Sequence, residues 1–144
     1  MKTANTIKAD VRTLLEGSVL KSFITSKGGA IYVDTRPTDS KKPDCVVSLI
    51  SGETGQASTK GLLIVKAFYS DELLNDTWYE NMSMGHTLQE LLFRFSESLV
   101  TDPTYNFQRV GRQIYSEQPN ELVASHQRYA VLKINFNINN TLIT

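Results

Sequence analysis

Residues 87–99 read TLQELLFRFSESL. The rest of the chain forms the surface against which the apolar side of this segment packs. Its apolar side chains recur at helical spacing and form one stripe, made of Leu88, Leu91, Leu92, Phe95 and Leu99. Thr87 followed by Glu90 predicts a capping box at the start of this helix. The Asp-Pro pair at 102–103 predicts its end. Because an isolated helix of this length is marginal in water, the stripe must pack against another part of the chain.

The remaining segments supply that surface, because most of them have the alternation of β-strands. Strands are predicted at 30–33, 45–50, 61–69, 107–115 and 128–139. The last is the clearest, with one apolar and one polar face. A slip in the alternation near Val110 and Gly111 predicts a β-bulge. Residues 70–85 are interpreted as irregular and residues 116–125 as a turn or loop.

A first helix is predicted near the N-terminus, capped by Asn5 or Thr6, with a short second turn after Gly17. Its inward line is Ile7, Val11, Leu14, Leu15 and Ser18. The order of helix, strands, helix and strands predicts an α+β fold in a single domain over residues 1–144. We expect a mostly antiparallel β-sheet, with the N-terminal helix and the central amphipathic helix packed on one face, and one long β-hairpin.

The charge of the chain narrows the classes of partner. Fifteen basic residues balance fifteen acidic ones, which argues against nonspecific nucleic-acid binding through a global basic field. Low net charge also offers little electrostatic resistance to self-association. No apolar run approaches membrane-spanning length and the N-terminus is polar, so we expect no membrane partner and a cytoplasmic site of synthesis.

Catalytic and metal-binding residues are sparse. Cys45 is the single cysteine, so it excludes an internal disulfide and is the only candidate thiol nucleophile, with His86 or His126 as its base. Because Cys45 begins an apolar strand, the preferred interpretation is a small buried hydrophobic residue. Two histidines without a cysteine or carboxylate cluster make a poor zinc site. We therefore predict no enzyme, no cofactor and no metal.

Three further motifs have both a functional and a structural interpretation. Asp71 and Glu72 could act as acid and base, but adjacent carboxylates in a polar loop are usually solvated. The glycines at 51–55 lack the Gly-Lys-Ser/Thr ending of a phosphate loop, so this segment is interpreted as a hairpin tip. Trp78 and Tyr79 could stack on a base or sugar, but an aromatic pair that pins a loop to the core is the preferred interpretation.

Two loops are the predicted interaction elements. Residues 51–60, SGETGQASTK, are predicted to form the tip of a long β-hairpin, and residues 35–43 form a proline-bearing loop. The candidate interaction residues are Gly52, Glu53, Thr54, Gly55, Gln56, Ser58, Lys60, Arg36, Lys41 and Lys42. The polar face of the last strand, or a sheet edge, is a further candidate for meeting a neighbouring subunit.

Several short sequence segments follow one another along the chain in a characteristic order. A helix ends just before GGAIY at 28–32, and a proline-bearing loop at 37–43 leads to an apolar strand at 46–50. A polar hairpin, a strand at 62–69, an amphipathic helix at 88–99 and a strand at 129–138 with a central Phe follow. This order resembles the tail-terminator and tail-completion proteins (head–tail joining, or neck, proteins) of long-tailed bacteriophages. The segment 73–84 and the loop at Pro119 are longer than the family pattern.

The resemblance implies an α+β subunit that assembles into a ring, commonly a hexamer, which caps the tail tube and presents a surface to the head connector. The implied partners are further copies of the chain, the tail tube protein, and the head connector or completion protein. DNA would only pass through the lumen of the ring. The implied location is the tail or neck of a virion assembled in the host cytoplasm, and the mechanism is binding rather than catalysis.

Three alternatives stay open from the sequence. The first is another neck component, such as a head-completion or stopper protein, because fold does not fix function. The second is a nucleic-acid-binding accessory module, which predicts tight and salt-sensitive DNA binding. The third is a small hydrolase, which requires Cys45 to be exposed with a lowered pKa.

Overall fold

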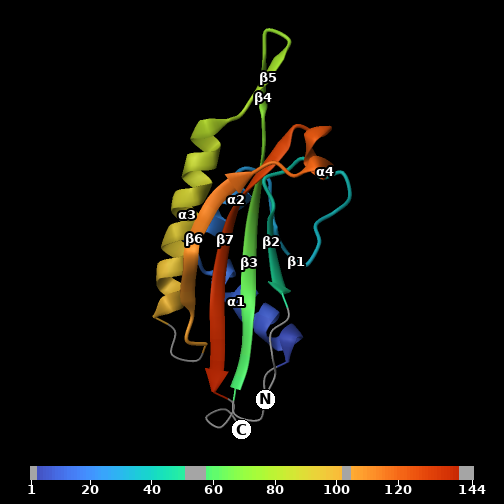
Figure 1. The fold of residues 1–144 in the computed structure, drawn as a ribbon. Coiled ribbons are helices and arrows are strands. Elements are labelled where there is room, and N and C mark those ends of the chain that lie inside the picture. Colours follow the sequence, from blue (N-terminus) through green and yellow to red (C-terminus); the bar gives the residue numbers. More distant parts are fainter. Residues whose placement is uncertain (1–2, 51–57, 102–104, 140–144) are drawn as a thin grey trace.

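The computed structural model describes residues 3–50, 58–101 and 105–139. The three long helices lie on one face of a long sheet, and a small hairpin projects beyond the end of that sheet (Figure 1). In chain order the described elements are α1 Ala4–Glu16, α2 Val19–Ser26, β1 Ile31–Val33, β2 Cys45–Ile50, β3 Ser58–Ser70, β4 Glu72–Leu74, β5 Thr77–Tyr79, α3 Met82–Val100, β6 Gln108–Glu117, α4 Asn120–Val123 and β7 Gln127–Asn139. The predicted α+β class is confirmed.

The main sheet has the strand order β1-β2-β3-β7-β6. β1 pairs with β2 in parallel, and the other neighbours are antiparallel, as the sequence predicts for most of the sheet. β3 and β7 pair from Ser58 opposite Asn139 to Ser70 opposite Gln127 and form the long axis of the molecule. β3 is therefore central, as its apolar faces indicate. β7 is also internal, so the edge strands of the main sheet are β1 and β6.

The apolar stripe of the central helix is buried as predicted. Its five residues join the large core beneath the sheet together with the inward residues of β7, which are Ala130, Leu132, Ile134 and Phe136. A fully buried Leu side chain contributes about 1.5–3 kcal/mol relative to an exposed one. This burial fixes α3 lengthwise along β6 and β7, as Figure 1 shows.

The start of α3 differs from the prediction. The helix begins at Met82, where the side chain of Asn81 accepts a hydrogen bond from the Met84 amide at 3.0 Å. Thr87 lies within the helix, and its hydroxyl donates to the Ser83 carbonyl, so the predicted capping box with Glu90 is wrong. Gly85 lies within the helix, and a Cβ there would lie 2.7 Å from the Tyr69 hydroxyl. The glycine permits close packing of α3 on β3.

The first helix also starts earlier than predicted. Thr3 is the N-cap and accepts a hydrogen bond from the Thr6 amide at 3.2 Å, so neither Asn5 nor Thr6 caps it. Ile7, Val11 and Leu15 are buried as expected, but Leu14 is 39% exposed. Ser18 caps α2, which is the short second turn expected after Gly17.

The outer face of the sheet is less polar than predicted. Ile64, Tyr129 and Val131 form a second small buried cluster there, and Leu122 of α4 packs against it. The guanidinium carbon of Arg36, from the β1–β2 loop, lies 3.9 Å from the centre of the Phe68 ring. This loop and α4 cover the end of the sheet near the start of β7, so the polar face of β7 is limited to its second half.

Four other predictions can be compared with the structure. The bulge near Val110 is confirmed by a register shift between Arg109 and Ile114 on β6. Residues 116–125 contain the short helix α4, and the supposedly irregular stretch 70–85 contains β4, β5 and the first turn of α3, so both predictions are corrected. Of the predicted hairpin tip, 51–57 lies outside the described residues, and 58–60 already belongs to β3.

Candidate interaction surface

The candidate catalytic residues do not form a site in the described part of the chain. Cys45 is fully buried, and burial, followed by the charge of Asp44, raises the pKa of its thiol to about 12. His86 lies on exposed helix surface with Nε2 3.4 Å from Glu90, and His126 stacks on Trp78. The described residues hold no group of three or more side chains suited to a metal ion. Cys45 therefore lacks the exposure and the lowered pKa that the hydrolase alternative requires.

Arg36, predicted as an interaction residue, holds the β1–β2 loop against the sheet. Its guanidinium donates to the Ser40 carbonyl at 2.5 Å and to the side chain of Gln127 at the start of β7. Burial, only partly offset by the charge of Asp44, lowers the pKa of Arg36. Arg36 is thus a structural residue. Lys41 and Lys42 on the same loop are exposed, as an interaction role requires.

Of the other predicted residues, only Ser58 and Lys60 lie in the described part of the chain, at the start of β3. Gly52, Glu53, Thr54, Gly55 and Gln56 lie outside the described residues. Ser58 opens β3 opposite Asn139. Lys60 is exposed and borders a surface hollow of about 460 Å³.

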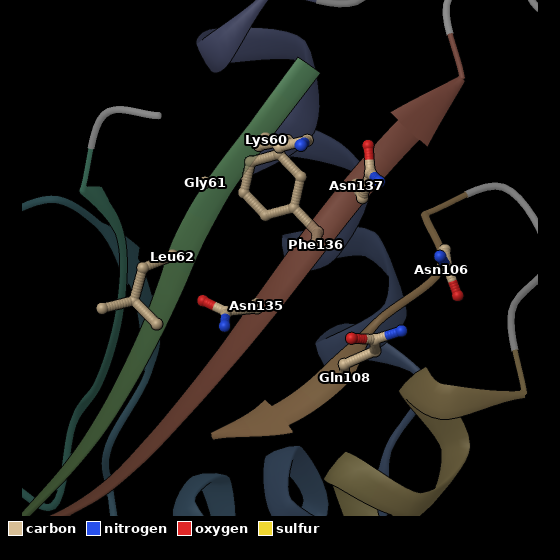
Figure 2. A pocket seen from close by; sticks show the side chains of 8 residues that line it. All are labelled: Lys60, Gly61, Leu62, Asn106, Gln108, Asn135, Phe136 and Asn137. Carbon is tan, nitrogen blue, oxygen red and sulfur yellow. The ribbon is translucent and has the colours of Figure 1, made fainter. Parts of the chain in front are cut away.

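This hollow, which we call the amide hollow, lies where β3, β7 and the start of β6 come together (Figure 2). It is lined by Lys60, Gly61, Leu62, Asn106, Gln108, Asn135, Phe136 and Asn137. Four carboxamides and one ammonium group offer both donors and acceptors, with no carboxylate among the lining residues. The hollow can therefore hydrogen-bond a polar partner surface such as exposed peptide groups.

The opposite end of the sheet carries the most exposed apolar element of the described chain. β4 and β5 form a hairpin with Leu73 opposite Trp78, and we call its residues 72–79 the arm. Leu73, Leu74, Trp78 and Tyr79 are each between 44% and 53% exposed. Cross-strand pairing puts Leu73 and Trp78 on one face, and Leu74 and Tyr79 on the other. Both faces of the arm thus present apolar surface.

The local sequence explains why the arm forms. Asn75 and Asp76 both have positive φ, at 50° and 62°, which is the backbone of a two-residue type I′ hairpin turn. Asn and Asp tolerate this left-handed region better than most residues. A two-stranded hairpin is marginal by itself in water, so the arm needs support at its base.

That support is a charged clamp formed by Asp71, Glu80 and Arg128. Arg128 Nε lies 2.8 Å from Asp71 Oδ1, and its Nη1 lies 3.5 Å from Glu80 Oε1. Burial alone would lower the pKa of Arg128, but the hydrogen bond and charge of Asp71, with Glu80, raise it. Both strands of the arm are therefore tied to β7 where they leave the body.

An aromatic stack adds a second attachment. The rings of Trp78 and His126 lie 3.9 Å apart and are inclined by only 6°. His126 has a φ of 57°, in the turn that precedes β7, and its carbonyl accepts from the Asp71 amide at 2.7 Å. The prediction that Trp78 pins a loop is right in part, because the ring is pinned and yet remains half exposed.

The interpretation of 70–85 as irregular missed the arm and the clamp. The signal was present: two short β-prone runs, ELL and TWY, flank the turn pair Asn75-Asp76. Arg128 carried no such signal, because its two carboxylate partners lie far from it in the chain.

No protein-family model matches this chain, and no curated protein matches it. None of the helices in the described ranges combines the length and the apolarity needed to cross a membrane.

Proposed function

We propose that this chain is a structural subunit of a long-tailed phage or prophage virion that forms a ring, ends the tail tube and joins it to the head connector. The single observation that carries the proposal is the clamped arm, since a monomer has no use for a rigid element with two half-exposed apolar faces. Contiguous exposed apolar groups of this kind are typical of protein–protein contacts. The order of helices and strands on which the resemblance to tail terminators rests is also the order of α1, β1, β2, β3, α3 and β7.

The two ends of the sheet support two different contacts. The arm is apolar, whereas the amide hollow is polar, and about ten residues of β3 separate them, or roughly 33 Å. A subunit that stops the growth of a tube needs one surface that binds the end of the tube. Its opposite surface must not offer a binding site for further tube protein. We assign the tube contact to the amide hollow, together with the segment 52–56 that the sequence marks as an interaction element. We assign the contact with a neighbouring subunit to the arm.

The test is a tube-growth assay. Tail tube protein from the same phage or prophage is polymerised with and without this chain, and tube lengths are measured by electron microscopy. The chain is expected to bind at tube ends and to shorten the tubes in proportion to its concentration. Tubes of unchanged length with no chain at their ends would count against the proposal, and salt-sensitive binding to DNA alone would favour the nucleic-acid alternative.

A further inference from the structure

We infer that the arm of one copy docks in a groove between α1, α2 and α3 of a second copy. The inference rests on the proposed function, because it names the lateral contact of the proposed ring. The groove has a volume of about 470 Å³ and is lined by Thr13, Leu14, Gly17, Ser18, Val19, Leu20, Leu91, Arg94, Phe95 and Ser98. We call it the helix groove.

The helix groove has the chemistry that an apolar arm requires. Leu14 is 39% and Val19 59% exposed at its rim, so burying them would remove apolar surface from water. Leu14 was predicted to face the core, but it is exposed on the rim of the groove. There it can contact the arm of a second copy. The arm supplies Leu74 and Tyr79 on its free face, away from the stack of Trp78 on His126.

The charges of the helix groove and of the arm are complementary, which favours this groove as the docking site. Arg94 is the one charged residue in the lining, and it forms no ion pair with any described residue. The arm carries Glu72 and Asp76, which are exposed and likewise have no ion-pair partner within the described ranges. Docking would bring these carboxylates toward Arg94, and like charges would disfavour an arm-to-arm contact instead.

A neighbouring hollow fits the arm less well. It lies on the other side of Arg94, toward β6, and its lining includes the carboxylates of Glu90 and Glu97. These would repel Glu72 and Asp76 of an incoming arm. The helix groove has no carboxylate in its lining and is therefore the better acceptor.

The contact must join two molecules. The arm projects beyond the N-terminal end of α3 (Figure 1). The residues of α3 that line the groove all lie in the second half of that helix. Leu91 is nine residues after Met82, or roughly 14 Å along the helix, in the direction away from the arm. An arm on one side and a groove on another give a head-to-tail contact, which repeats from copy to copy and ends only when a ring closes.

Two variants test the arm and the helix groove separately. Leu74→Asp places a charge on the free face of the arm. Val19→Asp places a carboxylate in the lining of the helix groove, at the first residue of α2, where a helix start favours acidic groups and folding is spared. Val123→Asp is the matched control, because Val123 on α4 is 50% exposed but lies in neither surface. Circular dichroism confirms that each variant folds.

The experiment measures mass by light scattering across concentration. We expect each single variant to raise the concentration needed for assembly at least about tenfold, and Val123→Asp to assemble like the natural chain. A mixture of Leu74→Asp and Val19→Asp retains one intact arm and one intact groove, so it should give one-to-one dimers and nothing larger.

Three results would overturn the inference. They are normal assembly of either single variant, a mixture that stays monomeric while the natural chain assembles, and a natural chain that is monomeric up to about 1 mM. The tube-growth assay distinguishes these from failure of the proposed function. If the Leu74→Asp variant still caps tubes and assembles normally, only the docking of the arm is contradicted, and the proposed function stands.

Discussion

Arg128 and Asp71 are joined by an ion pair of 2.8 Å at the point where the arm leaves the sheet. The Asp71 side chain is only 5% exposed, and Arg128 also reaches Glu80 on the other strand of the arm. A single guanidinium thus determines how the arm is presented, so the clamp links the fold of the body to the proposed contact between copies.

Replacing Arg128 by Gln should destabilise the protein by about 1–3 kcal/mol, because Asp71 would remain buried without its charged partner. The arm should also lose its fixed orientation. Urea unfolding followed by circular dichroism gives the free energy of unfolding, and Trp78 emission reports separately on the arm.

The matched control is Arg12→Gln. Arg12 pairs with Glu16 at 3.7 Å, but both side chains are well exposed, so the loss should stay below about 0.5 kcal/mol. Equal losses for the two variants would mean that the clamp is an ordinary surface ion pair.

Gly85→Ala should destabilise the protein by about 1–3 kcal/mol, although alanine normally favours a helix. The added Cβ would lie 2.7 Å from the Tyr69 hydroxyl and 3.0 Å from its ring, and that ring is buried. Thermal unfolding provides the measurement. Gly17→Ala is the control, since its Cβ would meet nothing closer than 3.8 Å. A neutral Gly85→Ala would show that α3 can shift away from β3.

Cys45 should be inert toward a thiol reagent in the folded protein at pH 8 and react fully in denaturant. Its pKa is raised from 9.0 to about 12 by burial, so folded protein keeps a proton that unfolded protein releases. Stability should therefore fall as the pH rises above 9.0, and Cys45→Ala should reduce that slope. Rapid labelling of folded protein would revive the hydrolase alternative.

Replacing residues 52–57 by a tight turn should leave folding intact but impair capping of tubes. Ser58 and Thr59 must be kept, because they pair with Asn139 and Ile138. Unfolding in urea and the tube-growth assay supply the two readouts. A shortened chain that limits tube length normally would remove this segment from the proposed tube contact.

The predictable parts of the fold are those with long periodic patterns. The stripe from Leu88 to Leu99 and the alternation of β7 fixed the type and the approximate extent of the main helix and the last strand. The helix starts were missed because several residues near each start can cap. Asn81 and Thr3 are the N-caps, and the close packing of Gly85 on Tyr69 explains why a glycine occurs within α3.

The candidate site was predictable only in part. Exposure of Lys41, Lys42 and Lys60 follows from their loop or strand-end positions, but the contact that holds Arg36 against the sheet could not be predicted, because its partner Gln127 is distant in the chain. Gln127 is 91 residues away. The arm has a local signature in Asn75-Asp76, whereas the clamp and the helix groove arise from long-range packing, which periodicity does not encode.

The most direct measurement is the position of this chain in virions made by the genome that encodes it. Purified particles would be labelled with a gold-conjugated antibody against the chain and imaged by electron microscopy. We expect label at the head-proximal end of each tail and nowhere along the tube. Virions that contain none of the chain, or that carry label along the whole tube, would contradict the proposed function.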